Sequence, residues 1–400
     1  MNIKVSFLRS SLHDNKDLDN QNRIFLDNIS SNLGTNLEYS KLEDYDCSLK
    51  LIFIESGGSE GLFLNNIDKL KEPYYLLTNG SNNSLAASLE ILTYLNLHGK
   101  KGEILHGSEE YIARRIKEIA SLDKVKNTLK DARLGVIGKP SDWLISSLPN
   151  KDKLKEKFGV ELIDIKIDEL ISNFKNIDLS KYHENKELIF DEHELDEAKK
   201  MYLAIDKIKE DHNLDALTIR CFDLLTTCKT TSCLAFGLLN SKKVISTCEG
   251  DIMALVSMEI LSLLLEESVF QANPSRIDLE KREIVFAHCT IPFDMLESYK
   301  LDTHFESGIG VAIKGELKED DVTIFRLSSD LKHYFVVEGH IERNLNEKNL
   351  CRTQIQIKCD ESIDSLLKSP CGNHHLIVYG HHKKLIEKLM NSYSLEKVNK

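Results

Sequence analysis

The order of the hydrophobic segments constrains this chain more than any other feature. Through residues 1–281, short runs rich in Val, Ile and Leu alternate with longer helical segments. That alternation predicts parallel sheets covered by helices. From residue 282 onwards, short β-type runs such as EIVFAHCTI and DVTIFRLSS follow one another without helices between them. This second pattern is typical of an antiparallel sheet or barrel.

The length of the chain predicts several domains, because 400 residues exceed what one hydrophobic core usually holds. We expect an α/β fold of two Rossmann-like domains with parallel sheets, followed by a C-terminal antiparallel β-barrel-like domain. The expected bounds are 1–131, 132–281 and 282–400. The charged stretch KVKNTLKDA supplies the first boundary, and HHKKLIEKLMNSYS predicts a helix that closes the last domain.

Composition narrows the class of partner. With 41% hydrophobic and 29% charged residues the chain has the composition of a globular protein. Its net charge of -12 argues against nucleic acid or an anionic membrane as a partner. Nine scattered cysteines predict reduced thiols and a cytoplasmic location. The longest apolar run, residues 252–265, is shorter than the ~20 residues that span a bilayer, so we expect a core helix.

The segment CEGD, residues 248–251, places two carboxylates at a strand-to-helix corner. In open α/β sheets, ligands bind where the carboxyl ends of strands lead into helices. Asp251 has two interpretations, as a cap of the following helix or as a catalytic acid. Glu249 precedes the glycine, where a cap would be redundant, and is therefore a candidate base or metal ligand.

Histidines concentrate in the last third of the chain, and imidazole together with carboxylate binds Mn, Fe, Co or Zn. No histidine pair has the helical spacing of a zincin, so a metal site must be assembled across strands. Neighbouring strand residues face opposite ways, so only one of His374 and His375 can point to a given site. His304 and Glu306 share a face if their segment is extended. His288 is either a core histidine or a ligand.

Three arginines, Arg220, Arg326 and Arg352, lie within or beside β-type runs. Each forms a structural salt bridge or clamps an anionic group of a ligand. The glycine-rich loops GGSEG and TNGSNNS match neither the dinucleotide fingerprint nor the P-loop, so nucleotide binding is not favoured.

Several short motifs occur in a recognisable order, and with them the chain resembles the L-fucose isomerase-like family, which is related to L-arabinose isomerase. The resemblance implies two α/β domains, a C-terminal barrel-like domain and homotrimers or homohexamers with sites near subunit contacts. It also implies a divalent metal, usually Mn²⁺, and the interconversion of an aldose and a ketose. The motifs that carry it are TIRCFDLL (218–225), CEGD (248–251), AHCTIP (287–292), HFESGIGVAIKGEL (304–317), CRTQI (351–355) and GNHHLIVYG (372–380).

By this resemblance Glu249 and His374 are metal ligands, and His288 matches a further ligand of the arabinose isomerases. Asn273 stands where relatives carry a second carboxylate. An amide oxygen coordinates a metal but does not accept a proton as a base. Either Glu249 works with another acid, Asp251 or Glu306, or catalysis is altered.

The sequence therefore predicts a metal-dependent isomerase that moves a proton between C1 and C2 of a sugar through an ene-diol. Mn²⁺ or another divalent ion is the expected cofactor, and a deoxy or sulfonated sugar the expected substrate. The alternative is a sugar-binding or sensing relative that has lost catalysis. The residues expected to contact the sugar are Arg220, His304, Glu306, Arg352 and Asn373.

Overall fold

The computed structural model describes residues 2–11, 16–181 and 190–398. The chain divides into two compact units, Met1–Lys124 and Val125–Lys400. The stretch expected as the first boundary, residues 124–132, begins in the last turns of helix α4, Glu109–Lys130, because its lysines and its leucine favour a helix. Among the described residues no helix combines the length and apolarity needed to cross a membrane.

The first unit holds a five-stranded parallel sheet in the order β2-β1-β3-β4-β5. Its central strand β3, LKLIFI, is buried throughout, as expected for a parallel strand covered on both faces. The strands are β1 Ile3–Leu8, β2 Leu37–Tyr39, β3 Leu49–Ile54, β4 Tyr74–Leu77 and β5 Gly102–Leu105. The helices besides α4 are α1 Lys16–Leu33, α2 Glu60–Asn65, the 3-10 helix Ile67–Lys69 and α3 Ser84–Leu97.

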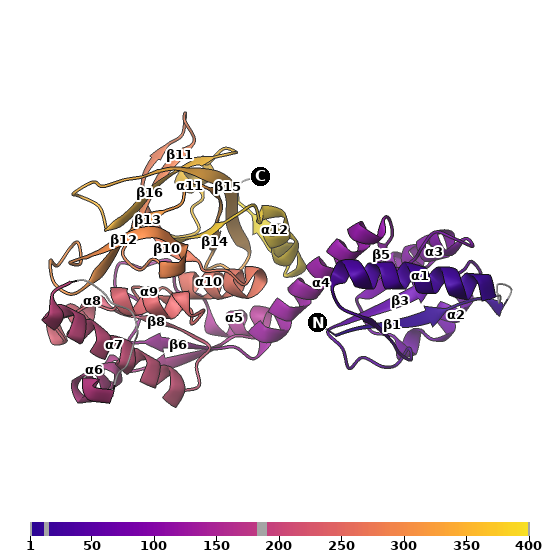
Figure 1. Ribbon diagram of the computed structural model, residues 1–400, viewed down its shortest axis with the longest axis horizontal. Helices are drawn as coiled ribbons and strands as arrows, with labels where there is room; N and C mark the ends of the chain where they lie inside the picture. The colour runs from indigo at the N-terminus through magenta and orange to yellow at the C-terminus, as the bar shows by residue number, and fades with distance from the viewer. Residues whose placement is uncertain (1, 12–15, 182–189, 399–400) are drawn as a thin grey trace. The chain divides into compact units, whose positions relative to one another are not determined.

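The second unit begins with a four-stranded parallel sheet in the order β7-β6-β8-β9 (Figure 1). Its strands are β6 Arg133–Ile137, β7 Glu161–Ile165, β8 Ala216–Ile219 and β9 Ser246–Thr247. The α-helices are α5 Lys151–Phe158, α6 Ile167–Asn176, α7 Glu192–Asp211, α8 Phe222–Thr227, α9 Cys233–Ser241 and α10 Ile252–Leu265, with a 3-10 turn at Leu179–Lys181.

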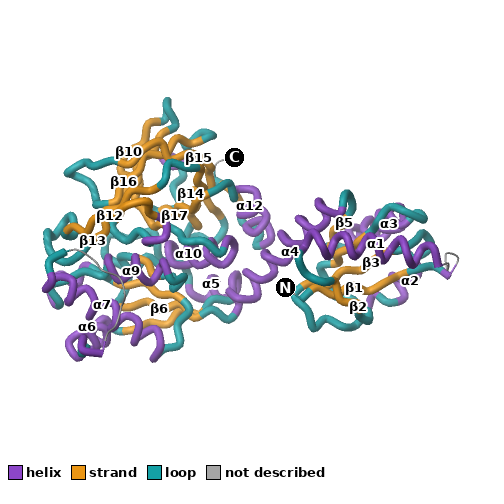
Figure 2. The backbone as a smooth tube through the Cα atoms, in the orientation of Figure 1, coloured by secondary structure: helices purple, strands orange, loops and turns teal. Residues whose placement is uncertain are grey.

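A closed antiparallel barrel follows, in the order β14-β17-β10-β11-β16-β15 with β15 returning to β14 (Figure 2). The two parallel sheets and the barrel confirm the predicted fold class. The barrel strands are β10 Phe270–Asp278, β11 Glu283–His288, β14 Asp321–Leu327, β15 His333–Asn344, β16 Thr353–Cys359 and β17 His375–Tyr379. Outside it lie the 3-10 turn Phe293–Met295, the pair β12 Leu296–Asp302 and β13 Ala312–Leu317, and α11 Ser365–Lys368, α12 Lys383–Ser392 and β18 Glu396–Lys397.

The barrel begins with β10, which precedes residue 282, the expected start of the last domain. Pro274 hides this strand in the sequence, because proline lacks the N–H that a central strand requires. The strand accommodates it with a bulge, seen as a register shift against β11 between Pro274 and Arg276.

The parallel sheet and the barrel share one hydrophobic core. It contains Ile137 and Leu217 from the sheet together with Phe286 and Ile357 from the barrel. Helix α10 packs against β8 on one side and β14 on the other (Figure 1). Its residues are buried almost throughout, which explains a helix that is apolar all round and confirms the expected core helix.

Candidate active site

The backbone at CEGD turns sharply between β9 and α10. Glu249 and Gly250 both adopt left-handed conformations, with φ of 65° and 71°, and a non-glycine residue held there is under strain. The Glu249 carbonyl accepts a hydrogen bond from Ser141 N at 2.9 Å. A Cβ on Gly250 would lie 2.7 Å from Lys139 O, so only glycine fits. The turn therefore fixes the direction of the Glu249 side chain.

Asp251 caps α10 and forms the centre of a buried ion pair. Its Oδ1 accepts a hydrogen bond from Ala254 N at 2.8 Å, and Arg326 lies 3.1 Å from both carboxylate oxygens. Neither Asp251 nor Arg326 has exposed surface. Burial opposes ionisation, but Arg326 and His374 hold the pKa of Asp251 well below its usual range. Arg326 thus takes the structural role of the two predicted for it.

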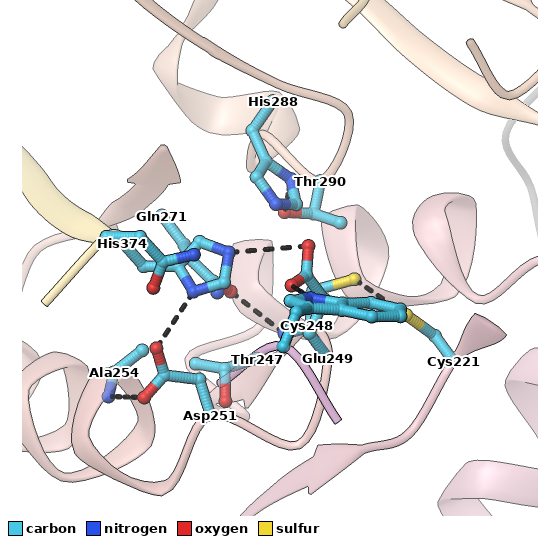
Figure 3. A network of polar contacts seen from close by, with 12 residues as sticks. Cys221, Thr247, Cys248, Glu249, Asp251, Ala254, Gln271, His288, Thr290 and His374 are labelled. Carbon is cyan, nitrogen blue, oxygen red and sulfur yellow. Dashed lines mark hydrogen bonds and ion pairs between the residues drawn. The ribbon is translucent and has the colours of Figure 1, made fainter. Parts of the chain in front are cut away.

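His374 joins the two carboxylates of the turn (Figure 3). Its Nδ1 donates to Asp251 Oδ2 at 2.8 Å, and its Nε2 lies 3.5 Å from Glu249 Oε1. That Nε2 is buried and makes no hydrogen bond. Burial lowers the pKa of His374, but the two carboxylates outweigh it and raise the pKa to about 9. A bound cation must therefore displace a proton here.

His375 points the other way, into the barrel, as strand alternation requires. Its ring centroid lies 5.9 Å from that of Phe286 and 5.5 Å from that of Phe335. Burial lowers the pKa of His375 to about 3, so the ring is neutral. Of the neighbouring pair, His374 is the one that faces the carboxylates.

His288 completes a cluster with Glu249 and His374 (Figure 3). One ligand atom from each of the three residues lies within 4.8 Å of the others. Burial and the neighbouring His374 lower the pKa of His288 to about 3, which leaves it as a neutral imidazole. One carboxylate and two imidazoles suit a divalent transition metal. The Asp251 contact to His374 Nδ1 resembles the outer carboxylate that orients metal-binding histidines.

Asn273 lies on β10 beside this cluster. Two residues earlier, Gln271 Oε1 accepts a hydrogen bond from Cys248 N at 2.9 Å, so this face of the strand meets the turn. Ala272 pairs with His375, and the antiparallel register therefore places Asn273 opposite His374. The Asn273 Oδ1 atom is buried without a hydrogen bond.

Trp143, the only tryptophan of the chain, belongs to the site although the sequence reasoning did not select it. Its Nε1 donates to Glu249 Oε2 at 2.6 Å. The indole is 51% exposed and lies edge-on to Phe222, with the ring centroids 4.9 Å apart. Burial would raise the pKa of Glu249, but His374, His288 and Trp143 lower it to about 2. The available signal was a lone tryptophan in a loop directly after a parallel strand.

His304 and Glu306 lie in and beside a turn, so the extended segment that would have put them on one face is not formed. The Gly308 amide donates to His304 O at 2.8 Å and closes the turn. His304 Nε2 remains 3.6 Å from Glu306 Oε2. Burial and the charge of Glu249 raise the pKa of Glu306, which places this carboxylate in the electrostatic reach of the cluster.

The remaining predicted residues differ in how strongly they are engaged. Arg220 is held by Asp142 at 2.6 Å and by Asp223 at 3.1 Å. Arg352 donates from Nε to Thr303 O at 2.7 Å, beside the turn that carries His304. Asn373 is exposed, and its carbonyl accepts a hydrogen bond from His375 Nδ1 at 3.0 Å.

Comparison with known proteins places the chain near sugar isomerases. It is 23% identical over 319 residues to the sulfoquinovose isomerases of Priestia megaterium and Priestia aryabhattai, an alignment that covers 74% of this chain and 71% of each relative. The sulfoquinovose isomerase of Alkalicoccus urumqiensis is 23% identical over 233 residues, 54% of this chain and 53% of that protein. No family model matches the chain. The similarity supports the predicted isomerase class, while the L-fucose isomerase-like family stays a prediction.

Proposed function

We propose that this chain is a metal-dependent aldose–ketose isomerase of the L-fucose isomerase-like family that acts on a sulfonated sugar. The convergence of Glu249, His288 and His374 from three separate elements carries the proposal. The similarity to sulfoquinovose isomerases supports the reaction and the class of substrate.

The cluster fits a divalent ion such as Mn²⁺. Glu249, His288 and His374 would hold it, with Asn273 Oδ1 as a further oxygen ligand, because Nε2 of His374 and Oδ1 of Asn273 are buried without hydrogen bonds. When bound, the ion would stabilise the negative charge that develops on the C1 and C2 oxygens of the sugar. Asp251 is fully buried with both oxygens engaged. We therefore assign it the positioning of His374 and not the proton transfer considered from the sequence.

Proton transfer falls to Glu306 in this proposal. One carboxylate oxygen of Glu249 accepts a hydrogen bond from Trp143 at 2.6 Å, and the other faces His374. This arrangement suits a metal ligand. The Glu306 side chain is 58% exposed and can reach a bound sugar. It would remove the C2 proton of the aldose and return it to C1, while the O2 proton moves to O1.

Arg352 is the better candidate for the sulfonate group. Both sides of Arg220 are occupied by carboxylates, at 2.6 Å and 3.1 Å. Arg352 meets its acidic partner, Asp302, only at 3.4 Å and stacks on Phe305 at 5.9 Å. A guanidinium placed in this way can still bind a sulfonate through two N–H groups. Asn373 stays in the proposal as a contact to the sugar. His304, whose Nδ1 is held by Ser307 Oγ at 3.0 Å, is assigned instead to positioning the turn that carries Glu306.

The decisive experiment uses sulfoquinovose and the same sugar without its sulfonate, each with Mn²⁺ in deuterated water. We expect ketose and deuterium at the transferred position from the sulfonated sugar, and far weaker turnover of the neutral one. Glu249→Gln should lose almost all turnover, whereas Glu156→Gln, exposed on α5, should not. An Arg352→Met variant should raise KM for the sulfonated sugar alone. Absence of ketose from a full panel of aldoses would refute the isomerase.

A sugar-binding relative without catalysis is the second candidate, and Asn273 is the observation that favours it. Calorimetry would then detect binding of the sulfonated sugar with no hydrogen exchange at C1 or C2. Asn273→Asp separates the two cases. It should create turnover in a sensor that lacks only this carboxylate, and should change an active enzyme by a modest factor.

A further inference from the structure

A second cluster of possible metal ligands adjoins the first but shares no residue with it. The two meet at Cys289, whose Sγ lies 3.8 Å from Nδ1 of the preceding His288. Cys233, Cys289 and His304 are all buried, and one ligand atom from each lies within 4.8 Å of the others. The sulfur atoms of Cys233 and Cys289 are 3.2 Å apart. Cys233 is the first residue of α9, Cys289 follows β11, and His304 lies in the turn after β12. Three distant segments therefore meet at one buried point.

A third thiol adjoins this group. Cys351, just before β16, packs against Cys233 and Cys289 in a small core of its own. Hydrogen bonds with Cys233 and Cys351, together with burial, hold the pKa of Cys289 well above its usual range. All nine cysteines of the chain are free. The three sulfur atoms are therefore available as ligands.

The histidine of the group is oriented for coordination. His304 Nδ1 hydrogen-bonds Ser307 Oγ at 3.0 Å, which leaves Nε2 as the nitrogen that can present a lone pair. Nε2 lies 3.6 Å from the Glu306 carboxylate, beyond a normal hydrogen bond. A partner on one ring nitrogen that fixes the other is the usual arrangement around metal-binding histidines.

We propose that Cys233, Cys289, Cys351 and His304 form a second metal site that binds Zn²⁺, separate from the site at Glu249. Three thiolates and one imidazole are a ligand set of structural zinc sites. Soft sulfur ligands also select against Mn²⁺, which prefers oxygen. The two sites would therefore take different ions from the same solution.

The site would cross-link segments that lie far apart in the sequence. It connects α9 of the parallel sheet to the ends of β11 and β16 in the barrel. It also fixes the turn that carries Glu306, two residues after His304. Binding of Zn²⁺ converts the thiols to thiolates and releases their protons to solvent. A disulfide between Cys233 and Cys289 would occupy two sulfurs and leave His304 without a role.

Cobalt substitution tests this site on the full chain, reduced and freed of metal. We expect one equivalent of Co²⁺ to give a thiolate-to-cobalt charge-transfer band with tetrahedral d–d bands, and Zn²⁺ to remove both. Cys233→Ser and His304→Gln should weaken this binding at least about 100-fold. Cys47→Ser, in the first unit, should bind as the wild type does. Glu249→Gln should keep the thiolate band, which separates this site from the proposed active site.

Thermal melting keeps the test decisive if a cysteine variant folds poorly. Zn²⁺ should raise the Tm of the wild type and of Cys47→Ser, and leave that of His304→Gln nearly unchanged. Absence of a charge-transfer band in the wild type, or an equal band in Cys233→Ser and His304→Gln, would overturn the proposal. So would a wild-type chain that binds no Co²⁺ and is isolated with Cys233 linked to Cys289.

Discussion

The chemistry of single residues in this site depends on which neighbour holds each polar atom. His374 can present Nε2 to a cation because Asp251 takes its other nitrogen, at 2.8 Å. Asp251 in turn stays ionised in a fully buried position because Arg326 lies 3.1 Å from both of its oxygens. The sequence predicted Glu249 and His374 as partners because their motifs are recognisable. It could not predict the ion pair with Arg326, because nothing local indicates which buried charges meet.

Asp251→Asn tests this chain of contacts. The change leaves Arg326 buried without its counter-charge and removes the acceptor that orients His374. We expect a loss of about 3–5 kcal/mol in the free energy of unfolding and a 10- to 100-fold weaker Mn²⁺ affinity. Urea unfolding and metal titration measure the two effects. Asp142→Asn, at the exposed partner of Arg220, should cost less than about 1 kcal/mol. Equal effects from the two variants would refute the assigned role.

Glu259, a buried carboxyl group on α10, makes stability depend on pH. Burial, and secondarily Asp215, raises the pKa of Glu259 to about 7 from the ordinary value of 4.5. Because this pKa is higher in the folded than in the unfolded chain, the folded protein is most stable at acidic pH, where Glu259 is neutral. That stability is lost as the pH rises through about 7.

The Glu259→Gln variant should therefore be more stable than the wild type only at higher pH. At pH 5 the two proteins should differ little, and at pH 8 the variant should be more stable by about 3 kcal/mol. Denaturant unfolding across this range measures the difference. Glu267→Gln, exposed just after the same helix, should show no such trend. A constant difference at every pH would mean that the carboxyl group does not titrate in this range.

The strand-to-helix turn at CEGD is the structural element that places Glu249. The sequence predicted this corner well, since a short β-type run, a glycine and a long apolar helix occur there in order. It predicted the turn at His304 and the contact from Trp143 poorly. Those features depend on loops that are closed by distant partners, such as the hydrogen bond from Trp143 to Glu249. The bulge of strand β10 was not predicted for a different reason, since Pro274 lacks the N–H that a regular strand requires.

Gly250→Ala tests how rigid the turn is. Alanine in the left-handed conformation costs about 1–2 kcal/mol, and its Cβ would also lie 2.7 Å from Lys139 O. We expect a loss of more than about 2 kcal/mol and almost no turnover. Gly308→Ala is the matched control, because its φ is 69° and nothing lies within 4 Å of the added Cβ. The free energy of unfolding of this variant should fall by the cost of the left-handed conformation alone. Equal losses would show that contact with Lys139 does not matter.

At the scale of the whole molecule, the segment that follows β6 joins the proposed active site to the surface. Trp143, Ile145 and Leu148 are 51%, 89% and 57% exposed, which places three large apolar side chains within six residues. A concentration of this kind is typical of a protein contact. The resemblance to L-fucose isomerases implies homotrimers or homohexamers with sites near subunit contacts. We therefore propose that a second copy of the chain covers this segment.

Ile145→Glu tests the assembly without touching the metal ligands. A charge in an apolar contact between subunits costs several kcal/mol because it loses its hydration, so the variant should sediment as a monomer. Its circular dichroism should match the wild type, since the residue is 89% exposed and contributes little to the core. Turnover should fall with dissociation, because Trp143 would lose the surface that shields it from water. Leu97→Glu, at an 80% exposed position of α3, should leave the assembly intact. A wild-type chain that sediments as a monomer, or an Ile145→Glu variant that sediments as the wild type does, would refute this interface.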